Sequence, residues 1–312
     1  MLEHPAGRGT IVAGTSAHCP TSPRPYQVPG ASPIPAPNTH LIGVGGERTE
    51  DLDRLEGEAI SIIRDAYRFF APCSVLWSMG KDSTALLWLM RKAFLGVVPM
   101  PVVLLDTGME LPEVYAFRDR IAREWNLDMR VEACPPEESC DQSLPPQARA
   151  AARKTEGLRT LLARQGDRAV FVGIRRDEQA TRAKERIVSP RSLDGGWNVR
   201  EQPPEFWGYT LTDVPHGGHV RVHPLLAWTE LDVWRYTKRE GIPIVSLYLA
   251  RDGMRYRSLG EKNITLPIAS SASTIDEIIE ELATTLEPER AGRTMDHETE
   301  ASFERLRAGG YM

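Results

Sequence analysis

The feature that most constrains the fold is a repeated alternation between short apolar runs and longer amphipathic runs. Between residues 74 and 224, strand-sized apolar stretches are separated by segments with the apolar spacing of helices. The predicted strands are Ser74–Ser78, Val102–Asp106, Met129–Ala133, Ala169–Arg175 and His219–Pro224, and the predicted helices between them are Ser83–Phe94, Pro112–Trp125 and Ala151–Gln165. The alternation predicts an α/β fold with a parallel five-stranded sheet and helices on both faces.

The ends of the chain differ from this central part. Eight of the 24 prolines lie within residues 1–40, among small and polar residues, so residues 1–48 are predicted to be a disordered leader. An amphipathic helix follows, with Leu52, Leu55 and Ala59 at helical spacing. We expect one α/β domain over residues 49–240 and a C-terminal extension over residues 241–312, with helices at Thr229–Glu240 and Thr274–Thr285.

Composition excludes several classes of protein. The net charge of −5 argues against nucleic acid or an anionic membrane as the main partner, and no apolar run is long enough for a transmembrane helix. The four cysteines lack the spacing of a metal site. Cys134 and Cys140 are close enough for a disulfide, although free thiols are favoured in a chain that starts without a secretory signal. We expect a cytoplasmic protein.

The first chemical motif joins the first predicted strand to the helix after it. Exposed backbone N–H groups at a helix start bind anions, glycine permits close approach, and a lysine adds positive charge. The spacing is not that of a Walker loop, because four residues do not separate two glycines and an aspartate follows the lysine. The bland alternative is a strand-to-helix turn with an ordinary N-cap. The predicted ATP- and pyrophosphate-binding loop is Ser78, Met79, Gly80, Lys81, Asp82 and Ser83.

Two further motifs follow later strands. Asp106, at the end of its strand in a Leu-Asp-Thr-Gly turn, is a candidate nucleotide ligand, although such turns are common. Gly173 begins a basic segment in which six Arg or Lys residues face three acidic ones between residues 175 and 191. Arginine suits bidentate recognition of phosphate or sulfate, and the alternative is a solvated loop with internal ion pairs. Its candidate anion ligands are Arg175, Arg176, Arg182, Lys184 and Arg186.

Five ordered motifs together resemble a known family. These are SMGKDS (78–83), LDTG (105–108), GIRRDE with RAKER (173–178 and 182–186), PEFW (204–207) and HPLLAWTELDVW (223–234), and the likeness extends to ERAGR at 289–293. They resemble the small catalytic subunit of bacterial ATP sulfurylase, sulfate adenylyltransferase subunit 2. This subunit belongs to the N-type ATP pyrophosphatases and phosphoadenylylsulfate reductases, which have an adenine nucleotide alpha hydrolase-like fold.

The resemblance implies a reaction and assigns roles to the candidate residues. The expected enzyme makes adenylyl sulfate and pyrophosphate from ATP and sulfate, with Mg²⁺ accompanying ATP and a GTPase large subunit as partner. Lys81, Arg175 and Arg176 are the expected catalytic residues. Arg182, Lys184 and Arg186 are expected to hold the second anion, and no carboxylate is assigned as a metal ligand.

Some features of the sequence leave other functions open. Glu261 stands where the resembling family usually has cysteine, so adenylylation of a different oxyanion is an alternative. Reduction of adenylyl sulfate or its 3′-phosphorylated form is disfavoured, because that chemistry needs a nucleophilic cysteine in the tail and none follows Cys140. tRNA thiolation is weakened by the lack of paired cysteines. A regulatory nucleotide-binding protein would not need an arginine cluster for a second anion.

Energetics favour a separate partner. Adenylyl sulfate contains an anhydride of higher transfer potential than the bond broken in ATP, so its synthesis is uphill. This chain has no Walker loop, so a driving GTPase would be another polypeptide. The expected docking surface includes the part beyond Thr229 and the charged tail Glu289–Met312. Trp228 and Trp234 are candidates for this contact, with burial in the core an equally weighted alternative.

Overall fold

The computed structural model describes residues 46–192, 196–198, 200, 202–205, 213–285 and 289. They belong to one compact unit within residues 31–312. Its helices are α1 (Gly46–Phe70), α2 (Lys81–Ala93), α3 (Pro112–Glu124), α4 (Pro146–Gln165), α5 (Glu230–Glu240) and α6 (Ile275–Thr284). Its strands are β1 (Cys73–Leu76), β2 (Val102–Asp106), β3 (Met129–Ala133), β4 (Ala169–Phe171), β5 (Val188–Arg191), β6 (His219–Val222), β7 (Met254–Arg255) and β8 (Ile268–Ala269).

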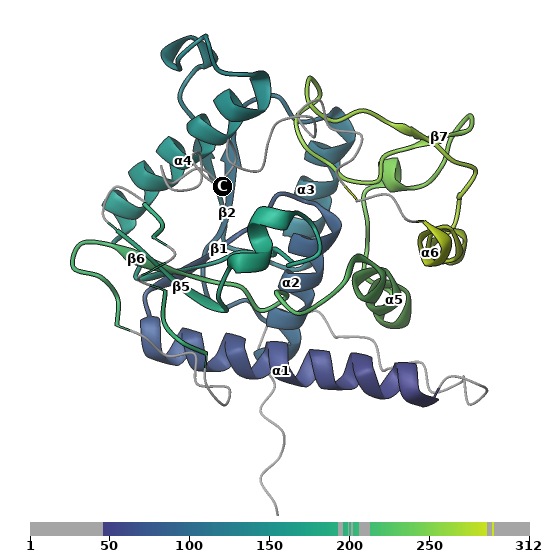
Figure 1. Cartoon of the computed structure of the whole chain (residues 1–312), viewed down its shortest axis with the longest axis horizontal. Helices are drawn as coiled ribbons and strands as arrows, with labels where there is room; N and C mark the ends of the chain where they lie inside the picture. Colours follow the sequence, from purple (N-terminus) through teal and green to yellow (C-terminus); the bar gives the residue numbers. More distant parts are fainter. Residues whose placement is uncertain are drawn as a thin grey trace, which may run out of the picture. The chain divides into compact units, whose positions relative to one another are not determined.

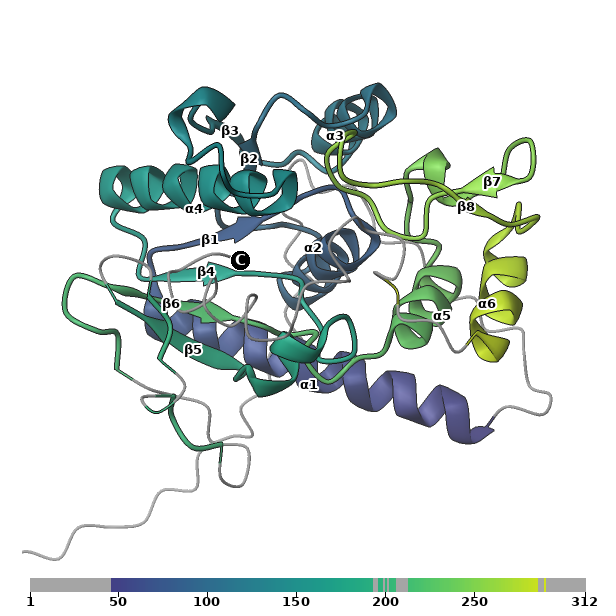
Figure 2. The ribbon, with the colours of Figure 1, turned by 45° about the horizontal axis from the view of Figure 1, so that its top comes forward.

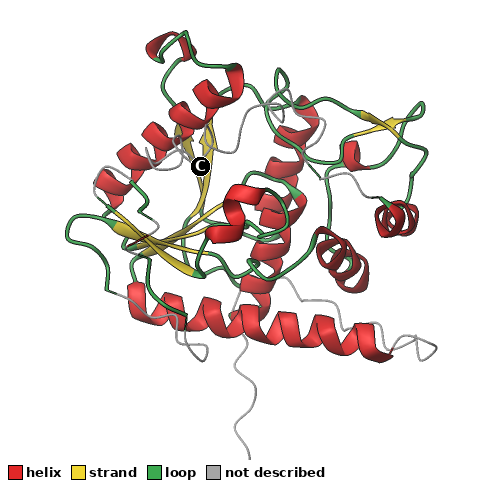
Figure 3. Ribbon diagram, in the orientation of Figure 1, coloured by secondary structure: helices red, strands yellow, loops and turns green. Residues whose placement is uncertain are grey.

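Figures 1 and 3 show the main sheet of the described chain, and Figure 2 labels its strands. Their order is β3-β2-β1-β4-β6-β5. Neighbours β3, β2, β1, β4 and β6 are parallel, with Val75 paired to Val102 and to Phe171. Strand β5 is antiparallel to β6 and forms the edge. The chain adds β2 and β3 on one side of β1 and then returns to place β4 on the other side. The order therefore reverses between β1 and β4.

Helices cover both faces of this sheet (Figure 2). On one face, alternate strand residues such as Val75, Val102 and Phe171 pack against α1, α2, α3 and α5. On the other face, Val103 and Val170 pack with residues of α4. Because side chains alternate across a strand, strands that are apolar on both faces must be covered on both sides. The predicted two-sided α/β architecture is confirmed.

Local sequence explains where several helices begin and end. Pro112 and Pro146 occupy the first turns of α3 and α4, where a missing N–H costs nothing. Thr229 forms a capping box with Asp232 at the start of α5, and Gly241 ends that helix in the left-handed conformation. A second capping box, Thr274 with Glu277, begins α6. The predicted ends of α2, α3, α5 and α6 agree with the structure within two residues, whereas α4 begins at Pro146, five residues before the predicted Ala151.

The sheet contains a sixth strand that the sequence pattern did not predict. All five predicted strands are present, and β5 (Val188–Arg191) is added at the edge. It contains Pro190 and lies in the basic segment interpreted as a ligand loop. Proline is tolerated on edge strands because one side has no partner. A four-residue strand with a proline and an arginine carries no alternating apolar pattern that would reveal it.

The C-terminal part packs against the sheet domain in the described residues. Helix α6 lies on α5, and β7 pairs with β8 in a separate two-stranded sheet. Trp228 and Trp234 are buried, each in an edge-to-face contact, with Tyr236 and Tyr248 respectively. Both tryptophans are therefore core residues. The predicted boundary at residue 240 stays a prediction, and the leader and the tail beyond Glu289 lie outside the described residues.

Two predictions from composition can be compared with the described residues. None of the helices in the part of the chain that the structure describes is long and apolar enough to cross a membrane. Cys73, Cys134 and Cys140 are free thiols, so the Cys134–Cys140 disulfide is not formed.

Candidate active site

The sequence-predicted anion loop lies where the strand order reverses. It follows β1, and Gly173 follows β4, the neighbour of β1 on the other side of the reversal. In open parallel sheets the two connections diverge at this point and leave a crevice beyond the carboxyl ends of the strands. The fold therefore brings the first and third motifs together at a position suited to a ligand.

Two backbone features shape the loop. Met79 is fully buried and has a φ of 59°, so it reverses the chain while its side chain fills the core. Gly173 lies against the beginning of α2. A Cβ atom on Gly173 would stand 3.0 Å from both the Cα and the nitrogen of Ser83. The close approach of the two backbones therefore requires glycine at position 173.

Side chains around the loop converge on the start of α2. The hydroxyls of Ser78 and Ser83 lie 3.2 Å apart, and Ser83 also donates to the carbonyl of Gly80. The N–H of Lys81 donates to Tyr248 Oη over 2.9 Å. Burial raises the pKa of Tyr248, so its hydroxyl stays protonated. Gly80 is the N-cap residue of α2 and has no side chain to occupy the helix start. Backbone N–H groups at the start of α2, with the hydroxyls of Ser78 and Ser83, therefore suit an anion.

Lys81 belongs to a buried cluster of charges at this loop. Its Nζ lies 3.1 Å from Asp82 Oδ2 and 2.5 Å from Glu289 Oε1. Arg175 is fully buried and contacts Asp82, Asp177 and Glu289, with Nη2 2.6 Å from Glu289 Oε2. Two cations thus face three carboxylates. Arg175 holds Asp82 and Glu289 around Lys81 and acts as a clamp behind the loop.

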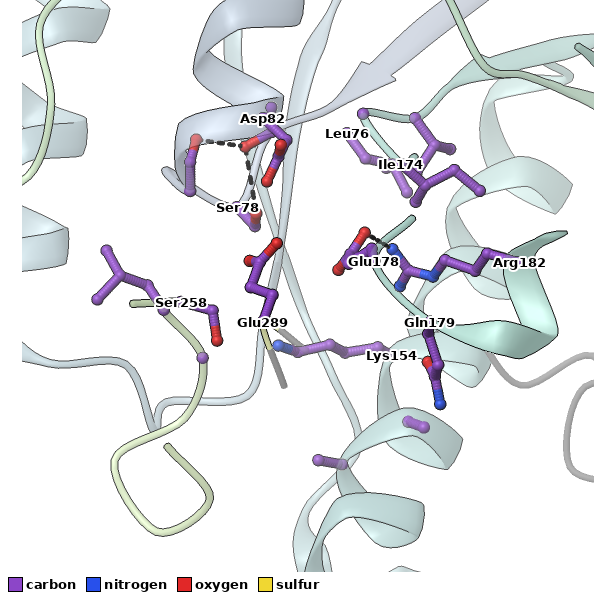
Figure 4. Close-up of a pocket in the computed structure, with 18 of the residues that line it drawn as sticks. Leu76, Ser78, Asp82, Lys154, Ile174, Glu178, Gln179, Arg182, Ser258 and Glu289 are labelled. Carbon is purple, nitrogen blue, oxygen red and sulfur yellow. Dashed lines mark hydrogen bonds and ion pairs between the residues drawn. The ribbon is translucent and has the colours of Figure 1, made fainter. Parts of the chain in front are cut away.

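The charge state of the cluster follows from its partners. Burial alone would lower the pKa of Lys81, but the carboxylates of Asp82 and Glu289 outweigh it and raise that pKa well above its ordinary value. Burial opposes the charge of Glu289 as well, yet Lys81 and Arg175 lower its pKa. Lys81 and Glu289 are therefore both charged at neutral pH. The carboxylate of Glu289 lies beside the predicted phosphate loop, close to Ser78 and Asp82 (Figure 4).

A cavity of about 320 Å³ opens from the loop. One wall contains Ser78, Gly80 and Lys81, and an apolar part contains Leu76, Val172 and Ile174. Figure 4 shows the ion pair of Glu178 and Arg182 across the cavity from Asp82. The remaining basic lining residues are Lys154, Arg191, Arg221 and His223. The cavity therefore joins an anion loop, an apolar surface and a second basic wall.

Glu261 also lines this cavity. Its side chain is buried, accepts a hydrogen bond of 2.8 Å from Thr107 Oγ1 and lies 3.6 Å from Lys154 Nζ. Lys154 is also 3.3 Å from Glu110. Glu261, which stands where the resembling family usually has cysteine, is thus a neighbour of Lys154, another residue of the cavity lining.

The predicted site residues divide into three groups: those that line the cavity, those that support the loop from the core side, and those that do neither. Ser78, Gly80, Lys81, Asp82, Ser83, Gly173 and Arg182 line the cavity. Met79 and Arg175 support the loop from the core side. Asp106 accepts hydrogen bonds from Gly108 N and Tyr115 Oη. Arg176, Lys184 and Arg186 do not line the cavity. Nη2 of Arg176 lies 3.4 Å and Nη1 of Arg186 lies 3.8 Å from Glu205 Oε2, and Lys184 is exposed.

Several lining residues were missed by sequence reasoning. Tyr248 and Glu289 are separated from the loop by more than 160 residues. Glu289 begins the ERAGR motif, but no local pattern placed either residue beside the loop. Arg221 did carry a signal, because His219, Arg221 and His223 alternate with valines in a predicted strand. Such alternation places polar groups on one face of a strand. A parallel strand with one polar face, such as β6, indicates that this face lies against a ligand site and not against the apolar core.

Comparison with known proteins identifies relatives that match most of the chain. The model of the phosphoadenosine phosphosulfate reductase domain family matches residues 72–267. The sulfate adenylyltransferase subunit 2 of Zymomonas mobilis is 38% identical over 300 residues, covering 85% of this chain and 99% of the relative. The protein of the same name from Geotalea daltonii is 39% identical over 295 residues, covering 83% and 97%.

Among solved structures, the FMN adenylyltransferase of Candida glabrata in complex with ATP is similar in fold. Its TM-score is 0.53 at 18% identity, and the match covers 81% of this chain and 91% of that protein. At this identity the likeness concerns the fold alone, and it agrees with the α/β architecture described above.

Proposed function

This chain belongs to the sulfate adenylyltransferase subunit 2 family, and we propose that it catalyses transfer of the adenylyl group from ATP to sulfate with release of pyrophosphate. The observation that carries this proposal is the cavity with two anion-binding walls. Its loop, at Gly80 and Lys81, suits the pyrophosphate part of ATP, and the opposite wall, with Arg182, suits a second anion.

The chemistry requires positioning and charge stabilisation. An oxygen of sulfate attacks the α-phosphorus of ATP, a new S–O–P linkage forms, and the bond to pyrophosphate breaks. Sulfate is already ionised at neutral pH, so no general base has to remove a proton. Lys81 and the backbone N–H groups of the loop would bind the leaving pyrophosphate, and Arg182 would reduce the repulsion between the two anions.

Magnesium is proposed as the companion of ATP. Among the residues that the structure describes, no group of three or more His, Cys, Asp and Glu side chains is arranged to hold a metal ion. Magnesium bound to nucleotide phosphates keeps several waters and needs only one or two protein carboxylates. Asp82 lines the cavity and fits this requirement. The ion would neutralise phosphate charge when bound.

A second subunit is part of the proposal. The relatives are named as subunit 2, which implies a complex with another subunit. A GTPase fits the energetics, because synthesis of the mixed anhydride is uphill and this chain contains one nucleotide loop. The free thiols Cys73, Cys134 and Cys140 are in keeping with a reducing, cytoplasmic location.

A different oxyanion is the second candidate acceptor. Glu261 is buried in the cavity wall, next to Thr107 and Lys154, where the resembling family usually has cysteine. A carboxylate at this point changes the charge and shape of the ligand space, and both influence which anion is accepted.

An assay of pyrophosphate release from ATP with a panel of oxyanions tests both candidates. The chain is assayed alone and together with its partner subunit. Sulfate-dependent release, with adenylyl sulfate as the product, is the expected result. Release that depends on another oxyanion and not on sulfate would support the second candidate. No release with any oxyanion, from a folded complex, would overturn the assignment.

A further inference from the structure

The cavity wall opposite the loop is built from two neighbouring strands and the short helix before them. Arg191 belongs to β5, Arg221 belongs to β6, and Arg182 lies in the 3₁₀ helix Ala180–Lys184. The antiparallel register pairs Ser189 with Arg221 and Arg191 with His219. All three arginines line the same cavity as Lys81. The two strands and the short helix therefore present three guanidinium groups to the ligand space.

These arginines are deeply placed for charged side chains. Arg191 is 2% exposed and Arg221 is 5% exposed, while the side chain of Arg182 is 15% exposed. Burial of an ion costs several kcal/mol unless opposite charge and hydrogen bonds compensate it. A valine, the residue found at the alternate positions of β6, could be buried here without this cost. A buried basic wall inside a cavity therefore indicates binding of an anion.

Carboxylates accompany the arginines of this wall. Arg191 Nη2 lies 2.9 Å from Glu185 Oε2, and Arg182 pairs with Glu178. Both carboxylates line the cavity with the three arginines. Burial, with help from Arg191 and Arg221, lowers the pKa of His223 to about 4, so that histidine is neutral. A guanidinium group has five N–H donors and no acceptor, so the three arginines of this wall suit an oxyanion.

We propose that the second anion of the reaction, a tetrahedral dianion such as sulfate, binds against the inner wall formed by Arg182, Arg191 and Arg221. This inference rests on the proposed function and identifies the acceptor subsite. Guanidinium groups match pairs of oxyanion oxygens, and the wall shares one cavity with the loop that holds the leaving group. The outer residues Lys184 and Arg186 do not line the cavity and are not part of the subsite.

Substitution of Arg221 is the sharpest test, because Glu178 and Glu185 keep their arginine partners. In the complex with the partner subunit, Arg221→Gln is expected to raise the KM for sulfate tenfold or more, with the KM for ATP within about twofold of wild type. Arg221→Lys keeps the charge without the planar fork and is expected to give an intermediate KM. The matched control is the Lys184→Ala/Arg186→Ala double variant, with a sulfate KM within about twofold of wild type.

Other outcomes contradict the subsite. A rise in the KM for ATP alone would assign the wall to a nucleotide phosphate, and unchanged constants in a folded Arg221→Gln variant would assign it to packing. A larger effect of the double variant would return the acceptor to the outer residues. If Arg221→Gln does not fold, the lysine variant decides between these results.

Equilibrium dialysis separates this proposal from the proposed function. Binding of radiolabelled sulfate is measured with a non-hydrolysable ATP analogue present, so turnover is not needed. Weaker sulfate binding by the Arg221 variants would support the subsite even if wild type formed no adenylyl sulfate. Equal binding by wild type and the variants would overturn the subsite and leave the proposed function standing.

Discussion

Replacement of Gly173 by alanine tests whether backbone contact positions the anion loop. The added Cβ would lie 3.0 Å from Ser83 Cα and N and 3.1 Å from the carbonyl carbon of Asp82. Carbon atoms pack best at about 3.5–4.0 Å, so the contact is too short by about 0.5 Å or more. All three atoms belong to the backbone, so relief requires movement of the loop or of the segment after β4. Such overpacking costs about 1–3 kcal/mol.

The larger effect should be on turnover. A misplacement of about 1 Å at a catalytic group costs on the order of 100-fold in rate, so a shift of half that size predicts about a tenfold fall in kcat/KM for ATP. Pyrophosphate release and thermal unfolding are measured together. Gly57→Ala is the control, because a Cβ at that exposed position of α1 has no neighbour within 4 Å. It should keep full activity and gain roughly 0.5–1 kcal/mol in stability. A Gly173→Ala enzyme with wild-type kcat/KM would refute the idea that this contact sets the loop geometry.

Three further predictions follow from the same cluster and its surroundings. Lys81→Ala should abolish most pyrophosphate release and destabilise the fold by roughly 3–5 kcal/mol, because Glu289 loses a buried partner. Adding Glu289→Gln should restore part of the stability but not turnover. Recovery of turnover in the double variant would contradict a role for Lys81 in binding the leaving group. Tyr248→Phe keeps the ring contact with Trp234 but removes the acceptor for the N–H of Lys81. We expect the free energy of unfolding in urea to fall by about 1 kcal/mol and kcat/KM for ATP to decrease. Wild-type values for both would show that the hydroxyl is dispensable. Burial lowers the pKa of His223 from 6.5 to about 4, so between these pH values the unfolded chain binds a proton that the folded chain does not. The free energy of unfolding should therefore fall by roughly 3 kcal/mol as the pH is lowered from 6.5 to 4. His223→Gln should lose less unfolding free energy over this range.

The sequence by itself determined most of the elements and predicted where a nucleotide-binding loop would lie. Short apolar runs identified five strands and helical apolar spacing identified the main helices, since these patterns reflect local geometry that is independent of distant residues. Ser78–Ser83 was identifiable because its chemistry is contained in six consecutive residues between a strand and a helix. Thr229 and Gly241 likewise set the ends of α5 through contacts within a few residues.

The tertiary structure decided which distant groups share the cavity. The strand order, with its reversal between β1 and β4, is not encoded in any local period, and it places Gly173 against Ser83. It also brings Tyr248 to the N–H of Lys81 and directs Arg221 into the cavity, while Arg175 is withdrawn into an internal clamp. The physical reason is that the apolar cores on the two sheet faces fix the strand order. Charged side chains are then turned toward the ligand or the core by contacts far apart in the chain.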